Sequence, residues 1–345
     1  MPVTVNRILS RRRLVVRLAA SLVLLLLTAV AASAEPPQRI ILDTDPGVDD
    51  AIAILLALNS PELQVEAITV VPGNVTLQRG LENALKLVSL AGRCGVPVAA
   101  GAELPLVSKL ETAEFWHGQN GLGNVDLPAP ICRPDPRFGP DLIIELVHKY
   151  PGEIVLVPVG PLTNIALFLK AYPELRPKIR EIVSMGGSAA APGTVRPTVS
   201  FNILNDPEAA AIVYRSGIPV TMVGLDVTSK TVLIPERVSA FAQSSDPVER
   251  FVGAVVAFHR NVRGAEGVVV HDPLAVGAVI DPSFLATELL PVDVELRGEL
   301  TRGQMVVDRR TDATWRTGGA RSTRVALDVD AERFLAFLIG RLEAP

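Results

Sequence analysis

The chain has 345 residues, of which 48% are hydrophobic and 20% are charged, a balance typical of globular proteins with a large core. Its 37 Asp and Glu residues outnumber its 33 Lys and Arg residues, which gives a formal net charge of −4. This acidic balance argues against nucleic acid or an anionic membrane surface as the partner and favours a small or cationic molecule.

The first 34 residues have the pattern of a signal peptide. A basic stretch without acids is followed by an uncharged run over residues 18–34, which ends in Ala32-Ser33-Ala34. The run is shorter than the roughly 20 residues of a membrane span, so we predict cleavage after Ala34 and export to the periplasm or the medium, not a membrane anchor. Ser10-Arg11-Arg12-Arg13-Leu14 also resembles a twin-arginine export signal. Cleavage removes five Arg and no acid, leaving 28 basic against 37 acidic residues and a net charge of −9.

Apolar runs and amphipathic stretches alternate along the remaining chain. The apolar runs are rich in β-branched residues and predict strands buried on both faces, at 39–44, 65–71, 96–100, 154–159, 182–185 and 219–225. Helical patterns lie between them, at 49–58, 76–91, 141–149, 162–171 and 207–215. This alternation predicts an α/β fold with an open, mostly parallel sheet and helices on both faces. Ligands of such sheets bind beyond the carboxyl ends of the strands.

The last third of the chain has a different pattern. Residues 235–265 look helical, 291–297 and 305–309 alternate like antiparallel strands, and 330–342 form an amphipathic helix. We therefore predict one domain over residues 35–345 with a small C-terminal antiparallel β element. Cys94 and Cys132 have no metal-type setting, and we expect them to be structural, either paired or as separate thiols.

The densest group of polar residues follows the first predicted strand. Asp43, Asp45, Asp49 and Asp50 lie within eight residues, around a Pro-Gly turn and the start of a helix. The helix dipole explains an acid in the first helical turn, but four carboxylates at one strand end repel each other unless a cation collects them. Carboxylate oxygens without Cys or His nearby indicate a hard cation, Ca²⁺ or Mg²⁺.

The run from Asp43 to Ala51 resembles the signature of the inosine–uridine-preferring nucleoside hydrolases. The resemblance covers essentially the whole chain after the signal peptide, because further motifs follow in the same order. They are Val71-Pro72-Gly73-Asn74, His117-Gly118, Val159-Gly160-Pro161-Leu162-Thr163-Asn164, Met185-Gly186-Gly187, Phe201-Asn202, Asn205-Asp206-Pro207-Glu208-Ala209 and His271-Asp272-Pro273.

The resemblance implies a Ca²⁺-dependent hydrolase that splits the N-glycosidic bond of ribonucleosides with water. It implies calcium ligation by Asp45, Asp50, Asp272 and the main-chain carbonyl of Val159, with the ribose 2′- and 3′-hydroxyls and a water completing the shell. Asp45 is also implied as the base that takes the proton from this water, which the cation acidifies.

Further residues are implied as contacts of the substrate. Asp49 is expected to orient the water or the ribose hydroxyls, Asn74 and Asn202 to donate to the same hydroxyls, and Met185 to make an apolar contact with the ribose. The reaction is expected to pass through an oxocarbenium-like ribosyl cation, which the anionic Asp side chains stabilise.

Three histidines are candidates for contact with the leaving base. His271 is the candidate general acid, and the alternative is that it only orients Asp272. His117 matches a histidine near the base or the 5′ side of the substrate. His259, with Phe258 and Arg263 beside it, lies where the family has base-stacking groups.

The chain departs from the family where the ribose 5′-hydroxyl is bound. Family members use Asn and Glu before the Phe-Asn pair, and the aligned positions here are Thr194 and Ser200. We therefore expect weak recognition of the 5′-hydroxyl, and the sequence leaves the base preference open.

Two alternatives compete with this interpretation. A haloacid-dehalogenase-type phosphatase also begins with a strand ending in Asp-x-Asp, and it would use Asp43 as the nucleophile, Asp45 as the acid/base and Mg²⁺. An exported nucleoside-binding protein would keep the site and lack turnover. We further expect a homo-oligomer that has no membrane contact after signal removal.

Overall fold

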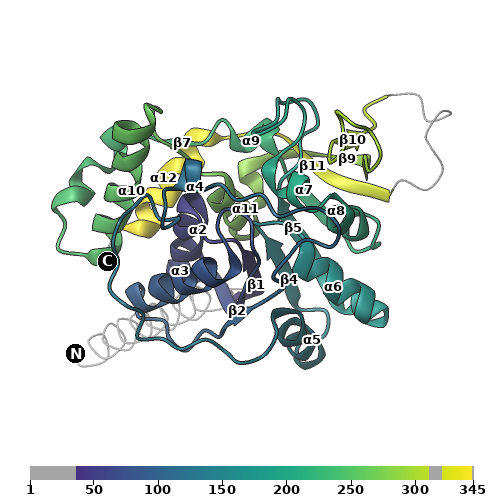
Figure 1. The fold of residues 1–345 in the computed structure, drawn as a ribbon, viewed down its shortest axis with the longest axis horizontal. Coiled ribbons are helices and arrows are strands. Elements are labelled where there is room, and N and C mark those ends of the chain that lie inside the picture. The colour runs from purple at the N-terminus through teal and green to yellow at the C-terminus, as the bar shows by residue number, and fades with distance from the viewer. Residues whose placement is uncertain (1–35, 311–320, 344–345) are drawn as a thin grey trace, which may run out of the picture. The chain divides into compact units, whose positions relative to one another are not determined.

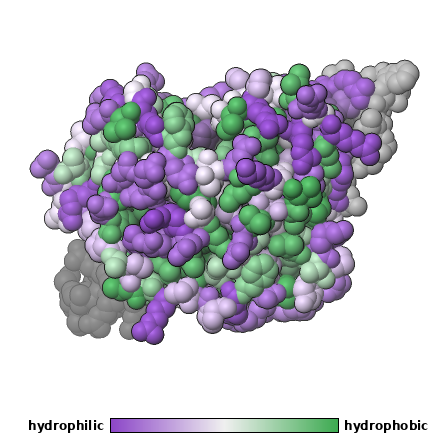
Figure 2. Space-filling model, viewed as in Figure 1, coloured by the Kyte–Doolittle hydropathy of each residue, from purple (hydrophilic) through white to green (hydrophobic). Residues whose placement is uncertain are grey.

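The computed structural model describes residues 36–310 and 321–343. The predicted signal peptide lies outside the described residues, and the chain from Gln38 onward forms a compact unit (Figure 1). Among the described helices, none is long and apolar enough to cross a membrane. Figure 2 shows hydrophilic and hydrophobic residues intermixed over the face of the molecule in view.

A sheet organises the described residues, with the strand order β10-β9-β11-β6-β5-β4-β1-β2-β3 (Figure 1). Its strands are β1 (Gln38–Thr44), β2 (Leu63–Val70), β3 (Val98–Ala100), β4 (Ile154–Pro158), β5 (Ile179–Met185), β6 (Val220–Val223), β9 (Leu285–Val294), β10 (Met305–Val307) and β11 (Arg321–Val329). All neighbouring pairs from β3 to β11 are parallel, whereas β9 is antiparallel to both β11 and β10. β1 lies inside the sheet between β2 and β4, so its carboxyl end is surrounded by those of its neighbours.

Helices cover both faces of the sheet. One apolar cluster joins the sheet to α2 (Val48–Asn59), α3 (Leu77–Leu90), α10 (Pro247–Arg263), α11 (His271–Ile280) and α12 (Ala331–Leu342). A second cluster joins the opposite face to α5 (Gly139–Lys149), α6 (Thr163–Ala171) and α8 (Pro207–Tyr214). In β1, Ile40 and Leu42 belong to the first cluster and Ile41 to the second, as expected for a strand buried on both faces.

Shorter elements connect these layers. They are α4 (Glu114–His117), α7 (Phe201–Asn205), α9 (Leu225–Thr228), the 3₁₀ helices η1 (Pro173–Lys178), η2 (Pro235–Gln243) and η3 (Pro282–Phe284), and the antiparallel pair β7 (Val232–Leu233) and β8 (Val268–Val269).

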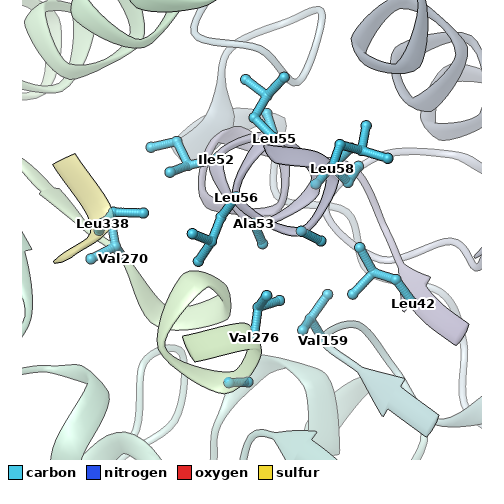
Figure 3. Packing of buried hydrophobic residues seen from close by; sticks show 14 of the residues in the cluster. Leu42, Ile52, Ala53, Leu55, Leu56, Leu58, Val159, Val270, Val276 and Leu338 are labelled. Carbon is cyan, nitrogen blue, oxygen red and sulfur yellow. The ribbon is translucent and has the colours of Figure 1, made fainter. Parts of the chain in front are cut away.

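α2 is the central helix of the first layer. All of its residues from Val48 to Leu58 are buried, so it has no solvent-facing side. Figure 3 shows its side chains pointing in all directions, toward Leu42 of β1, Val276 of α11 and Leu338 of α12. This packing fixes the amino end of α2, with its two acids, at the carboxyl edge of the sheet.

The observed fold confirms the predicted class and corrects its C-terminal part. The predicted strands and helices of the first two thirds lie within a few residues of the observed ones. The small antiparallel element exists, but it continues the main sheet because β11, which was not predicted, lies between β6 and β9. β11 has apolar neighbours on both faces, because Ala326 packs with the first apolar cluster and Val325 with the second. Its first four residues, Arg321 to Arg324, are polar, so the sequence lacks the continuous apolar run that predicted the other buried strands.

Cys94 and Cys132 form a disulfide, with their Cα atoms 5.1 Å apart. The bond links the turn between α3 and β3 to the segment of residues 101–138, which runs from β3 to α5 and contains α4. The main-chain nitrogens of Ile131 and Cys132 also donate to Ser89 Oγ at 3.1 Å. The disulfide therefore anchors the segment that carries His117.

Candidate active site

Four buried aspartates meet at the carboxyl edge of the sheet. Asp45 follows β1, Asp49 and Asp50 lie in the first turn of α2, and Asp272 lies in the first turn of α11. Each of these residues is at most 7% exposed, and oxygens of Asp49, Asp50 and Asp272 lie within 4.8 Å of one another. The amino ends of both helices face this cluster, and their dipoles stabilise negative charge there.

Asp50 is held by four hydrogen bonds. Its carboxylate accepts from Thr44 Oγ1 at 2.5 Å and from the main-chain nitrogens of Asp45 at 3.1 Å and Gly47 at 3.0 Å. Asn74 Nδ2 donates to it at 2.8 Å. A carboxylate with this many donors has one fixed orientation.

The carboxylate of Asp45 is buried, but only one of its two oxygens has a hydrogen-bond partner. Its Oδ2 accepts from the main-chain nitrogen of Asn74 at 2.7 Å, whereas its Oδ1 is buried without a hydrogen-bond partner. Gly73 and Gly160 pack against the two oxygens so closely that a β-carbon at either position would collide with them. An unpartnered carboxylate oxygen in the interior is costly, so this atom fits a cation ligand.

The cluster carries more negative charge than its protein surroundings compensate. Burial, together with the charge of Asp50, raises the pKa of Asp45 well above its usual range and that of Asp49 to about 7. Burial and the other three aspartates raise the pKa of Asp272 strongly. Among the described residues, no Lys or Arg forms an ion pair with any of the four. A divalent cation with oxygen ligands fits this site.

The predicted ribose contacts come to the same edge. Asn202 of α7 donates through Nδ2 to the carbonyl of Val159 at 2.5 Å, and the same nitrogen lies 3.3 Å from Met185 Sδ at the end of β5. Val159 itself follows β4 and pairs with β1 through Asp43, whose carbonyl accepts its N–H at 2.8 Å. Asn74 and Asn202 thus each hold a predicted metal ligand.

His117 reaches the cluster from the 101–138 segment. Its Nδ1 accepts from the main-chain nitrogen of Val48 at 3.1 Å and lies 3.9 Å from Asp49 Oδ1. Burial lowers the pKa of His117 to about 3, and nearby His259 and His271 act in the same direction. The imidazole is therefore neutral at pH 7, with its proton on Nε2.

The other two predicted histidines lie nearby in different surroundings. His271 Nδ1 is 2.8 Å from Thr228 Oγ1 of α9, and burial lowers the pKa of His271 to about 4. His259 is buried in α10 with its ring edge-to-face against Trp116 of α4, the centroids 5.9 Å apart. His259 and His271 lie close enough to His117 to affect its pKa, and His259 contacts Trp116, so we treat these four side chains as one wall of the proposed substrate site.

Thr194 and Ser200 use their hydroxyls on the backbone. Thr194 Oγ1 accepts from the main-chain nitrogen of Phe201 at 3.0 Å, and Ser200 Oγ accepts from that of Gly187 at 2.7 Å. Gly187 has a φ of 81°, which glycine adopts without strain. Both side chains thus stabilise the start of α7 and the turn after β5.

Sequence reasoning did not foresee the contacts that support the site from beneath, and it grouped Asp43 with the acids expected to gather a cation, which the structure does not support. Asp43 is fully buried and accepts from Thr69 Oγ1 at 2.5 Å and from Asn164 Nδ2 at 2.8 Å, and burial raises its pKa to about 7. A side chain so enclosed does not fit the nucleophile of the phosphatase alternative. The family motifs contain Gly73, Gly160 and Asn164, but the sequence does not predict what these residues contact. Thr228 lies in no motif, so the sequence does not predict its contact with His271.

Comparisons with known proteins show the family to which the chain is similar. The family described as "Inosine-uridine preferring nucleoside hydrolase" matches residues 40–336. The chain is 41% identical to an inosine-uridine preferring nucleoside hydrolase of Crithidia fasciculata over 89% of this chain and 98% of that protein. It is also 41% identical to the pyrimidine-specific ribonucleoside hydrolase RihA of Photobacterium profundum over 88% and 98% of the two chains.

A solved structure shows the same fold. The plant nucleoside hydrolase PpNRh1 superposes with a TM-score of 0.84 at 34% identity, covering 90% of this chain and all of that one. The phosphatase alternative is therefore wrong. The chain belongs to the family of inosine-uridine preferring nucleoside hydrolases and is a nucleoside hydrolase.

Proposed function

We propose that this nucleoside hydrolase depends on Ca²⁺ and uses water to split the N-glycosidic bond of ribonucleosides, releasing ribose and the free base. The observation that carries the proposal is the buried aspartate cluster with the unpartnered Asp45 Oδ1. Four acids in the interior, with no Lys or Arg partner among the described residues and with a neutral His117 beside Asp49, are stable as anions only around a cation.

The proposed metal ligands are the carboxylates of Asp45, Asp50 and Asp272 and the carbonyl of Val159. Asp49 offers a further oxygen within the same cluster. An all-oxygen donor set favours Ca²⁺ or Mg²⁺ over transition metals, and the family resemblance favours Ca²⁺. When bound, the cation lowers the pKa of a water molecule and holds the ribose diol.

The chain's own residues then supply the remaining chemistry. Asp45 accepts the proton of the attacking water, which its unpartnered Oδ1 is free to do. Asp49, Asn74 and Asn202 orient the 2′- and 3′-hydroxyls, and the carboxylates stabilise positive charge developing at the anomeric carbon. Asn74 donates one amide hydrogen to Asp50, so its second hydrogen remains for the ribose, whereas Asn202 Nδ2 donates to the carbonyls of both Val159 and Met185.

The leaving base meets the wall formed by the histidines and Trp116. His117 presents Nε2–H, because its Nδ1 accepts from the backbone. The contact between His271 and Thr228 fixes the orientation of the second imidazole. Both rings are neutral at pH 7, so a general acid in this wall must act as a neutral donor or gain its proton when substrate binds.

We also propose that the protein is exported. The signal-peptide pattern supports this, and so does the disulfide, because disulfides persist mainly in oxidising compartments.

The experiment that tests the proposed function is release of ribose from inosine and uridine by the purified protein. We expect activity that EGTA abolishes and that added Ca²⁺ restores, because the aspartate cluster loses its compensating charge without the ion. Reducing-sugar assays and isothermal titration with Ca²⁺ give the two measurements. Full activity in rigorously metal-free protein contradicts the calcium mechanism, and tight nucleoside binding without ribose release favours the binding-protein alternative.

Replacing His271 with alanine tests its role in activating the base. We expect inosine hydrolysis to fall by about 10²–10⁴-fold, the usual value of general acid catalysis, and hydrolysis of a nitrophenyl riboside to fall much less, since that leaving group needs no proton. His148→Ala, at an exposed position of α5, is the control and should change neither rate. Equal losses on both substrates mean that His271 only positions Asp272.

A further inference from the structure

A cavity of about 210 Å³ lies between α7 and three other segments, and none of its lining residues belongs to the proposed nucleoside site. The 101–138 segment contributes Ser108, Lys109 and Glu111 to its wall. The loop before α7 contributes Arg196, α7 contributes Asn205, and the turn before β10 contributes Arg302. Three cations thus reach one cavity from three parts of the chain that are distant in sequence.

These cations have different partners. Arg302 is fixed by two hydrogen bonds of 2.8 Å to Glu208 and by one of 3.2 Å to Ser108 Oγ, so its charge is largely compensated. The side chains of Lys109 and Arg196 form no hydrogen bond or ion pair within the described part of the chain. Glu111 is the acid among the lining residues, so the cavity keeps an excess of positive charge in a protein whose net charge is negative.

We propose that this cavity binds a phosphate dianion. The guanidinium group of Arg196 can donate to two phosphate oxygens, and Lys109 adds a point charge, whereas Arg302 stays bound to Glu208 and forms part of the cavity wall. The volume equals about seven water molecules at roughly 30 Å³ each, which holds a phosphate group with a small organic part. The phosphate is either free inorganic phosphate or the 5′-phosphate of a nucleotide.

The cavity and the active site share two segments of the chain, α7 and residues 101–138. α7 carries Asn202, which binds the Val159 carbonyl, and Asn205, whose Oδ1 accepts from the main-chain nitrogen of Glu111 at 3.2 Å. The loop that carries Arg196 is tied to the same helix by Thr194. An anion that joins Lys109 and Arg196 therefore clamps the 101–138 segment, with its His117, onto α7. This inference stands on the cavity alone and does not need the calcium mechanism.

Titration of the calcium-loaded protein with inorganic phosphate at constant ionic strength tests the proposal. We expect one saturable site per chain, whose dissociation constant rises by about tenfold or more in Arg196→Gln and in Lys109→Gln, as expected for loss of a charged hydrogen bond. Arg180→Gln, at an exposed position of β5 outside the cavity, is the matched control and should bind like the unmodified chain. Thermal unfolding of each variant confirms that it is folded.

A second arm repeats the titration with saturating inosine and with inosine 5′-monophosphate. Free phosphate as the ligand predicts that phosphate and inosine bind together, whereas a 5′-phosphate as the ligand predicts that only the monophosphate displaces phosphate. Three results overturn the proposal. The first is that phosphate shows no saturable binding, and the second is that Arg180→Gln weakens binding as much as the cavity variants do. The third is that both cavity variants still bind phosphate and inosine blocks this binding, which places the phosphate in the nucleoside site.

Discussion

Asp45→Asn should remove almost all turnover and leave the fold intact. The substitution keeps the shape of the side chain, and the amide oxygen can still accept from the main-chain nitrogen of Asn74. It removes one ligand charge and the proposed base in the same atom, Oδ1, which is buried without a partner. Loss of the base alone typically costs about 10²–10⁴-fold, so we expect kcat to fall by at least about 10³-fold.

Asp43→Asn is the matched comparison for this variant. Asp43 lies two residues earlier, within β1, and is equally buried. Its Oδ1 accepts from Thr69 and Asn164, and although its Oδ2 also lacks a partner, none of the four clustered aspartates affects its pKa. We expect it to keep Ca²⁺ binding and to lose much less activity. Ribose release, calcium titration and thermal unfolding measure the three quantities. An Asp45→Asn enzyme that keeps kcat within tenfold, with unchanged calcium affinity, contradicts both roles of Asp45.

The aspartate cluster could be predicted because its signals are local. Asp45, Asp49 and Asp50 follow a strand of continuous apolar residues, and a parallel sheet brings such strand ends together. Asp272 was predicted only from the family resemblance, because no local sequence pattern indicates that the amino ends of α11 and α2 meet. Their meeting depends on packing around the fully buried α2, which is a tertiary property.

Other parts of the site could not be predicted for the same reason. The close packing of Gly73 and Gly160 against Asp45 depends on three separate strand ends. The neutral state of His117 and His271 depends on burial, which no spacing of residues encodes. β11 escaped prediction because half of its residues are polar, and its position inside the sheet comes from pairing with β6 and β9. The sequence could not decide whether Cys94 and Cys132 pair, because the pairing depends on the distance between the two loops that carry them.

The two ends of the ribose should be recognised with very different strictness. The aspartate cluster, Asn74 and Asn202 all converge on the region proposed for the 2′,3′-diol, and these groups are buried. A 2′-deoxynucleoside removes one proposed metal ligand and leaves buried polar groups unpaired, a loss that can reach about 10⁴-fold in kcat/KM. We therefore expect strong rejection of 2′-deoxyinosine compared with inosine.

At the 5′ end, the aligned hydroxyls are already engaged. Thr194 and Ser200 accept from the main-chain nitrogens of Phe201 and Gly187, so neither offers a charge to a 5′-hydroxyl. We expect 5′-deoxyinosine and 5′-methylthioinosine to lose only about 1–2 kcal/mol of transition-state binding. The measurement is kcat/KM for inosine and its 2′-deoxy and 5′-deoxy forms under one condition.

Thr194→Val and Ser200→Ala separate a 5′ contact from a structural role. If both hydroxyls serve only the backbone, each variant lowers stability or overall activity without changing the ratio of kcat/KM between inosine and 5′-deoxyinosine. A 5′-deoxy penalty as large as the 2′-deoxy penalty contradicts weak recognition of the 5′ end. If the ratio of kcat/KM between inosine and 5′-deoxyinosine then stays large in both variants, another group makes the 5′ contact. His117 is the first residue to substitute in that case, because its Nε2–H is not used by the backbone.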